Sequence, residues 1–243
     1  MERRLLVAVS RSEKRPEEPV ENDPGDGGST LRRTREEFLS HGHTLPTEGR
    51  DYPEWHRGRK EYAAWVICVQ NGAVQARLDA ARAHMAEFLL EPYLRQAHVT
   101  LCVCGFLTPT RRSPDDYPLE AVQRSLRELE EAGPAPFDLE IGGLNSFAAA
   151  PFLEVRDPSG SLEEIRGVLS RESLDSRDGG YVPHVTVGLY SNRFDTRTVS
   201  ERISFFDPLP PITHRVAEIG LATYAADEIC GPLSMRRVFR LSQ

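Results

Sequence analysis

The chain has 243 residues, of which 39% are hydrophobic and 28% are charged, and its formal net charge is −7. This length supports one large domain or two small lobes around a real core. The acidic balance argues against broad binding to a nucleic-acid backbone, which requires clustered positive charge. It leaves room for a nucleotide or an RNA end in a locally basic cleft. We therefore expect a monomer without an extended nucleic-acid surface.

The sequence shows no sign of a membrane or of a secretory route. No stretch approaches the roughly 20 apolar residues that span a bilayer, and the run Leu5 to Val9 is too short for a signal peptide. The four cysteines, Cys68, Cys102, Cys104 and Cys230, lack the loop spacing of a disulfide framework. We therefore expect free thiols in a reducing compartment, a cytoplasmic location and no membrane partner.

Residues 1–60 differ in composition from the rest of the chain. Leu5 to Val9 predicts a short strand, and residues 10–29 lose all apolar periodicity, which predicts a loop or a disordered segment. Leu31 to Leu39 predicts a short helix capped by Ser29 or Thr30, and residues 40–60 are again irregular. We interpret residues 1–60 as an N-terminal extension, partly irregular or disordered, and residues 61–243 as the main domain.

From residue 61 the apolar pattern becomes regular and predicts alternating strands and helices. In chain order we expect a strand at Tyr62 to Val69, a helix at Ala73 to Leu90, a strand at His98, a helix from Pro118 to Gly133, strands at Phe137 to Ile141 and Phe152 to Val155, a helix with a capping box of Ser161 and Glu164, a strand at His184, a helix at Thr196 to Ile203, and strands at His214 to Tyr224 and Ser234 to Leu241 as a hairpin.

Two of these strands carry the same tetrad, a histidine followed by valine, threonine and an aliphatic residue. The copies begin at His98 and His184. Because side chains alternate along a strand, His98 shares a face with Thr100, and His184 shares a face with Thr186. Two such strands side by side would form a cleft with two imidazoles and two hydroxyls.

The tetrads occupy matching places in two strand-helix-strand units, which indicates an internal duplication. The first unit runs from the strand at Trp65 to the strand at His98, and the second runs from the strand at Leu153 to the strand at His184. This pattern predicts a pseudo-symmetric α+β fold of two lobes. The histidine strands would meet at a central cleft, with helices on the outer faces.

These motifs resemble the 2H phosphoesterase superfamily, also called LigT-like or 2′-5′ RNA ligase-like proteins. That family is defined by two His-x-Thr/Ser motifs, one in each lobe, which here are His98-Val99-Thr100 and His184-Val185-Thr186, the second preceded by Pro183. The resemblance covers residue 61 to the C-terminus. It implies a LigT-like fold and substrates such as RNA 2′,3′-cyclic phosphates, 2′-5′-linked oligoadenylates or other cyclic nucleotides. Hydrolysis of a 2′,3′-cyclic phosphate by the family's habit leaves a 2′-phosphate.

Two imidazoles that face one phosphodiester can divide the proton transfers of its hydrolysis, because an unperturbed pKa of about 6.5 permits both protonation states near neutrality. We therefore expect His98 and His184 to be catalytic. The hydroxyls of Thr100 and Thr186 would donate hydrogen bonds to the phosphate oxygens, and Tyr190 would stack on a base or close the sheet. This chemistry requires neither a metal nor another cofactor.

Other interpretations stay open at this point. The same cleft could sense a nucleotide or an RNA end without cleaving it. Alternation along the strand places Cys102 and Cys104 on the face of His98, so a metal site could use these three residues, or else His41 with His43. Packed thiols and solvated loop histidines are the more common outcomes. Phe147 and Tyr181 could line a base pocket, but core packing or loop anchoring is the more common role for either residue.

Overall fold

The computed structural model describes residues 27–172, 174, 180–206 and 209–242. The predicted strand at Leu5 to Val9 and most of the predicted loop at residues 10–29 lie outside the described residues. None of the helices in the described ranges has the length and apolarity that crossing a bilayer requires.

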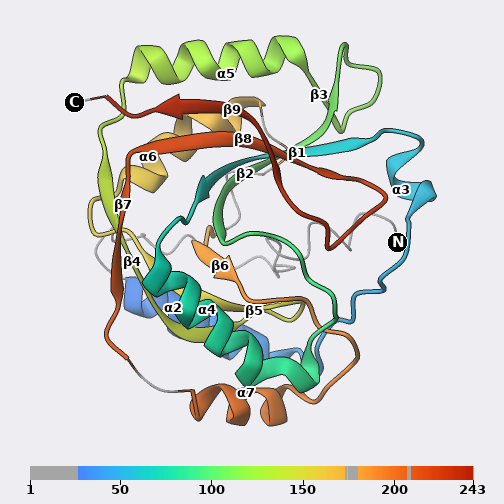
Figure 1. Ribbon diagram of the computed structural model, residues 1–243, viewed down its shortest axis with the longest axis vertical. Helices are drawn as coiled ribbons and strands as arrows, with labels where there is room; N and C mark the ends of the chain where they lie inside the picture. Colours follow the sequence, from blue (N-terminus) through green and yellow to red (C-terminus); the bar gives the residue numbers. More distant parts are fainter. Residues whose placement is uncertain (1–26, 173, 175–179, 207–208, 243) are drawn as a thin grey trace, which may run out of the picture.

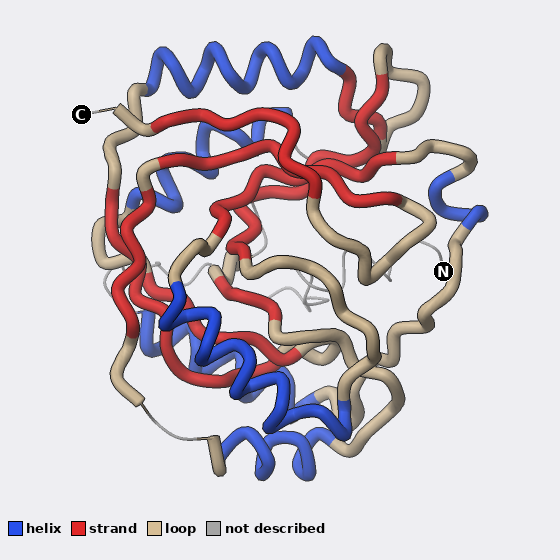
Figure 2. The backbone as a smooth tube through the Cα atoms, viewed as in Figure 1, coloured by secondary structure: helices blue, strands red, loops and turns tan. Residues whose placement is uncertain are grey.

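Within these ranges nine strands form one sheet, which is curled (Figures 1 and 2). The strands run in the order β7-β4-β5-β6-β2-β1-β8-β9, and β3 adds to β2. Every pair is antiparallel except β2 with β3. The strands are β1 (Glu61–Cys68), β2 (His98–Thr108), β3 (Asp116–Pro118), β4 (Phe137–Ser146), β5 (Pro151–Arg156), β6 (His184–Thr186), β7 (Ile212–Val216), β8 (Glu218–Ala225) and β9 (Ser234–Arg240).

The sheet has the same arrangement on both sides of its central pair, β6 and β2. Outward from that pair lie β5, β4 and β7 on one side and β1, β8 and β9 on the other. A helix connects the two inner strands of each side, giving the units β1-α4-β2 and β5-α6-β6. The predicted α+β class is confirmed, and the order of elements follows the predicted units. An origin by duplication stays a prediction.

The helices correspond closely to the apolar periodicity of the sequence. They are α2 (Gly27–Ser40), α3 (Pro53–His56), α4 (Gly72–Met85), α5 (Leu119–Ala132), α6 (Ser161–Leu169) and α7 (Thr196–Ser204), with the short 3₁₀ turns η1 (Ala86–Phe88) and η2 (Ser170–Glu172). One face of the sheet packs against α4, α5, α6 and α7 in a single apolar cluster that includes Val99, Val185, Leu78 and Ile165. The opposite face of β2 and β6 is therefore left for the histidines.

The sequence predictions for the start of α6 and for the strand at His214 are wrong in detail. Ser161 and Glu164 form no capping box, because α6 begins after Gly160 and the Asp157 carboxylate accepts the hydrogen bond from the backbone N–H of Leu162 at 2.6 Å. The single strand predicted at His214 to Tyr224 is two strands on opposite sides of the sheet, where β7 pairs with β4 and β8 pairs with β1. The predicted hairpin of the last two strands, β8 and β9, is confirmed.

The described part of the N-terminal segment packs onto the main domain. The predicted helix is present as α2, but it begins at Gly27, so the predicted cap at Ser29 or Thr30 is wrong: both positions lie inside the helix. Phe38 near its end is 2% exposed and joins the core. Beyond α2 the backbone N–H groups of Leu45 and Thr47 donate to the carbonyls of Ala148 and Tyr190 at 2.7 and 2.8 Å. The prediction that residues 1–60 form a separate extension stays a prediction, but residues 30–60 share contacts with the domain along their length.

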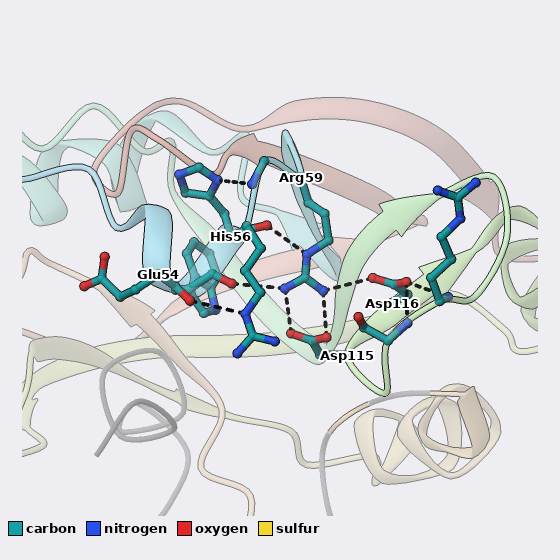
Figure 3. A network of polar contacts seen from close by, with 10 residues as sticks. Glu54, His56, Arg59, Asp115 and Asp116 are labelled. Carbon is teal, nitrogen blue, oxygen red and sulfur yellow. Dashed lines mark hydrogen bonds and ion pairs between the residues drawn. The ribbon is translucent and has the colours of Figure 1, made fainter.

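Arg59 connects this segment to the loop before β3 (Figure 3). Its guanidinium donates to Asp115 at 2.6 and 3.0 Å and to Asp116 at 2.9 Å, and it lies 3.6 Å from the ring centre of Phe106. The loop can approach because position 105 is glycine: its φ is +109°, and a Cβ there would lie 2.3 Å from the Asp115 carbonyl oxygen.

The Asp116 carboxylate is held by this network on all sides. Burial acts to raise its pKa, but hydrogen bonds from the backbone N–H groups of Arg112 and Ser113 and from the Arg59 side chain outweigh burial, so the pKa lies below its ordinary value. Its side chain is 2% exposed. An ionised carboxylate at this burial depends on its donors, because removing one partner leaves the charge uncompensated.

We expect Arg59→Met to lower the free energy of unfolding by about 2–4 kcal/mol, because it leaves Asp116 buried with fewer donors. Chemical denaturation at neutral pH measures this change. Arg112→Met is the matched control, since Arg112 is exposed and contributes only its backbone N–H to Asp116; it should change the free energy by less than about 0.5 kcal/mol. Equal losses in the two variants would contradict this account.

Candidate active site

The pairing of β2 with β6 brings the two sequence motifs together. Val99 lies directly opposite Val185 in an antiparallel register, and both side chains are fully buried in the core. Because side chains alternate, the residues on either side of each valine point to the other face of the sheet. On that face His98 stands opposite Thr186, and Thr100 stands opposite His184.

This register makes the two histidines diagonal neighbours on one face. Cβ atoms of diagonal neighbours in an antiparallel pair lie about 7–8 Å apart or slightly closer, which long side chains can bridge. The electrostatic influence of His184 on His98 agrees with this proximity. The structure therefore brings four of the five predicted site residues into one group: His98, Thr100, His184 and Thr186.

Both imidazoles are held in the same way. Nδ1 of His98 lies 2.8 Å from the Gln96 carbonyl oxygen, and Nδ1 of His184 lies 2.8 Å from the Val182 carbonyl oxygen. A carbonyl oxygen can only accept a hydrogen bond, so Nδ1 carries a proton in each ring. In the neutral form Nε2 is then the unprotonated nitrogen of both residues, available to take a proton.

The surroundings favour the neutral form of each imidazole. Burial lowers the pKa of His98 to about 4. The hydrogen bond to the Gln96 carbonyl acts to raise this pKa, whereas the positive charge of Arg95 and the neighbouring His184 lower it further. Burial also lowers the pKa of His184 below its ordinary value. An anion bound between the rings would oppose this shift, because a negative charge stabilises a protonated imidazole.

Two aromatic rings flank His184. Phe147 approaches the imidazole edge-on with 4.9 Å between ring centres, and Phe152 lies 5.4 Å away from it. The two phenyl rings stack on each other at 4.3 Å. Phe152 stands opposite Thr186 in the pairing of β5 with β6, so it shares the site's face of the sheet. Phe147 was considered from the sequence, whereas Phe152 gave no signal apart from its place in a strand.

Tyr93 and Arg95 border His98 and were missed by the sequence reasoning. The Tyr93 hydroxyl forms a hydrogen bond with Thr186, while burial raises its pKa. The Arg95 guanidinium lies 4.1 Å from the ring centre of Tyr224 and donates to the Ile229 carbonyl oxygen at 2.6 Å. Both residues lie in the irregular segment before β2, where no periodicity of apolar residues indicates which way a side chain points. Their nearness to the first motif in the chain was the only available signal.

Tyr190, the fifth predicted site residue, is not brought to the group. Its side chain is fully buried, and its hydroxyl lies 2.6 Å from the Ser146 hydroxyl. Strand β6 ends at Thr186, so alternation from His184 does not extend to residue 190. Of the two roles that the sequence leaves open, stacking on a base is corrected, because the side chain belongs to the core; the role of closing the sheet stays a prediction.

Tyr181 has an anchoring role. Its hydroxyl donates to the Thr100 carbonyl oxygen at 2.9 Å, and the Arg166 guanidinium lies 3.6 Å from the centre of its ring. This contact ties the segment before β6 to the middle of β2. It therefore supports the pairing that brings the motifs together.

A β-bulge determines where the cysteines of β2 point. The pairing of β2 with β1 skips Leu101, so the alternation of side chains reverses after it. Simple alternation places Cys102 and Cys104 on the face of His98, and this prediction is wrong. Both cysteines lie in the core with Trp65, on the opposite face, and both are free thiols as predicted.

The bulge also separates the residues of the alternative metal site. His98 and the two cysteines of β2 point to different faces, so the structure does not assemble them. His41 and His43 are both exposed. Within the described ranges, no group of three or more His, Cys, Asp or Glu side chains is arranged to hold a metal ion.

Several solved structures are similar to this chain over most of its length. E. coli LigT complexed with 3′-AMP is 15% identical with a TM-score of 0.50, and the match covers 76% of this chain and 99% of LigT. TT0787 of Thermus thermophilus is 17% identical with a TM-score of 0.49 over 74% of this chain and 97% of its own. Kluyveromyces marxianus Usb1 is 14% identical with a TM-score of 0.45 over 76% and 98%. The match to LigT complexed with 3′-AMP shows that the chain has a LigT-like fold.

The family follows from the sequence match. The model of the 2′-5′ RNA ligase superfamily matches residues 71–228. The chain therefore belongs to this superfamily of 2H phosphoesterases, as its two motifs indicate. No curated protein has a sequence that matches the chain.

The lowered pKa of His98 predicts a loss of stability in acid. Between pH 6.5 and about 4 the unfolded chain binds a proton at this position and the folded protein does not, so stability falls as the pH falls. When the pH is lowered from about 7 to about 4, the free energy of unfolding should fall in both proteins. We expect the fall to be smaller in His98→Gln than in the unaltered protein, by on the order of 2–3 kcal/mol. Denaturation at both pH values measures this. Identical losses would show that His98 is not held neutral.

Proposed function

We propose that the protein is a metal-independent phosphodiesterase that hydrolyses 2′,3′-cyclic phosphate or 2′-5′ phosphodiester bonds in nucleotides or at RNA ends. The observation that carries this proposal is the register of β2 with β6, which aligns His98, Thr100, His184 and Thr186 on one face. The neighbour E. coli LigT has been crystallised with 3′-AMP, which supports a nucleotide as the ligand of this fold.

The two imidazoles would divide the proton transfers. Nε2 of one neutral histidine takes a proton from the attacking water while the oxygen of that water forms a bond to phosphorus. The other histidine, protonated at Nε2, gives its proton to the ribose oxygen as the bond from that oxygen to phosphorus breaks. After turnover the two histidines have exchanged protonation states, and solvent restores them. The near symmetry of the site leaves the order of His98 and His184 to the direction in which the substrate binds.

The hydroxyls have a separate task, which is to stabilise negative charge on the non-bridging phosphate oxygens. Thr100 and Thr186 alternate with the histidines on the same face, so each hydroxyl lies next to an imidazole across the strand pair. Donors held in place before the reaction need no reorganisation as charge develops. Tyr93, hydrogen-bonded to Thr186, and Arg95 add a further donor and a positive charge on the His98 side.

We expect His98→Ala and His184→Ala each to lower the rate of hydrolysis by about 10²–10⁴-fold, because each variant removes one proton-transfer group. The measurement is product formation from a panel of 2′,3′-cyclic mononucleotides, 2′-5′ oligoadenylate and RNA with a cyclic-phosphate end, in the presence of EDTA. His41→Ala, an exposed histidine outside both motifs, is the matched control and should retain the rate.

Full activity in both motif variants would refute the assignment. Tight nucleotide binding by the unaltered protein, with no product after long incubation, would instead support a module that senses nucleotides or RNA ends.

The pH dependence should reflect the lowered pKa values of both histidines. The reaction requires one neutral and one protonated imidazole, and this form is most populated between the two pKa values. Because burial lowers the pKa of His98 to about 4 and also lowers that of His184, we expect the maximum of kcat/KM below pH 6.5. On the alkaline side kcat/KM should fall about tenfold for each pH unit. A maximum above pH 7 would contradict this assignment.

A further inference from the structure

A pocket next to His184 includes part of the N-terminal segment. It is formed by one helix and two strands, α2, β4 and β5. Its lining residues are Leu31, Arg32, Arg35, Leu144, Asn145, Glu154 and Arg156. The family model matches residues 71–228, so the α2 wall of the pocket lies outside the matched region.

The pocket begins one strand away from the catalytic pair. Glu154, which lines it, stands directly opposite His184 in the pairing of β5 with β6 and therefore shares its face of the sheet. Asn145 stands opposite Phe152 on the next strand, β4. From β6 to β4 is two strand spacings, about 10 Å, so the pocket extends sideways from the site along the same face.

Hydrogen bonds hold α2 over this face. The buried Asn145 amide donates to the Leu31 carbonyl oxygen at 3.1 Å and to the Glu154 carboxylate at 2.9 Å, which joins the helix to β4 and β5. The Arg33 guanidinium lies beside Gly180, in the segment that leads into β6. The helix is therefore a wall of the same groove that contains His184.

The charges in the pocket favour an anion. Arg32 and Arg35 are three residues apart and so share one side of α2, and Arg156 faces them from the end of β5. In the described part of the chain none of these three forms an ion pair, whereas Arg33 pairs with Glu37 at 3.7 Å. Arg35 donates one hydrogen bond, to the Ser200 hydroxyl on α7 at 3.3 Å.

One opposing charge is present. The Glu154 carboxylate is engaged by the Asn145 amide, and three guanidinium groups outnumber it. Arginine suits this position because its planar fork of donors matches a phosphate group.

We propose that this pocket binds a phosphate of the substrate other than the phosphate under attack, so that the substrate is an oligonucleotide which extends past His184 toward β4. The proposal rests on the proposed function of the cleft and adds a subsite to it. The protein as a whole is negatively charged, so a local cluster of arginines without ion pairs is the part of this groove that attracts a polyanion.

The test compares a 2′,3′-cyclic mononucleotide, which has no second phosphate, with a trinucleotide that ends in a 2′,3′-cyclic phosphate. We expect the unaltered protein to prefer the trinucleotide. The ratio of the two kcat/KM values should fall at least about tenfold in Arg32→Gln/Arg35→Gln and by a smaller factor in Arg156→Gln. Arg127→Gln, an exposed arginine on α5 that does not line the pocket, is the matched control and should keep the ratio. An unchanged ratio in the double variant would overturn the proposal.

A binding measurement separates this proposal from the proposed function. If the unaltered protein hydrolyses neither substrate, the proposed function fails, and the pocket is then judged by trinucleotide binding to His98→Ala. The slope of log Kd against log salt concentration measures the number of phosphate contacts. We expect this slope to fall by about 0.7 for each phosphate contact that an arginine substitution removes. An unchanged slope, or arginine variants that alter only inhibition by inorganic phosphate, would refute the oligonucleotide subsite.

Discussion

The pairing of β2 with β6 is the contact on which the site depends. Val99 and Val185 are fully buried opposite each other, and this apolar pair sets the register of the two strands. A shift by one residue would move the histidines into the core and the valines to the open face, so burial of the valines enforces the position of the imidazoles. Tyr181 reinforces the pairing by its hydrogen bond to the Thr100 carbonyl oxygen.

The same burial that aligns the histidines also controls their protonation. Both imidazoles lose hydration in the sheet, and two phenyl rings flank His184; loss of hydration disfavours the charged imidazole. The site is therefore poised to accept an anion, whose negative charge offsets the cost of protonating one ring. In the proposed hydrolysis, proton transfer and the binding of a charged substrate would be coupled through this single physical effect.

The N-terminal segment has two structural relations to the site. Arg59 ties residues 57–60 to the loop before β3, far along β2 from His98. Helix α2 covers the face of β4 beside His184 and brings Arg32 and Arg35 there. The segment contributes to the shape and charge of the groove, whereas the central strands contribute the histidines and threonines of the two motifs.

Local patterns in the sequence are sufficient to predict much of the fold. Apolar periodicity depends only on neighbouring residues, so it locates α4, α5, α6 and α7 and most strands, and the repeated tetrad identifies four residues that share a face. The alternation of side chains holds for these four residues because each is next to Val99 or Val185, which pair directly with each other.

The remaining features depend on contacts between distant segments. The bulge at Leu101 reverses the direction of Cys102 and Cys104, and the early end of β6 places Tyr190 in the core; both follow from strand pairing, which local periodicity does not contain. Tyr93 and Arg95 approach His98 only because an irregular segment folds back beside it. The sequence thus determines which residues can carry the chemistry, and the tertiary structure decides which of them meet, because the register and bulges of a sheet are set by packing across the whole core.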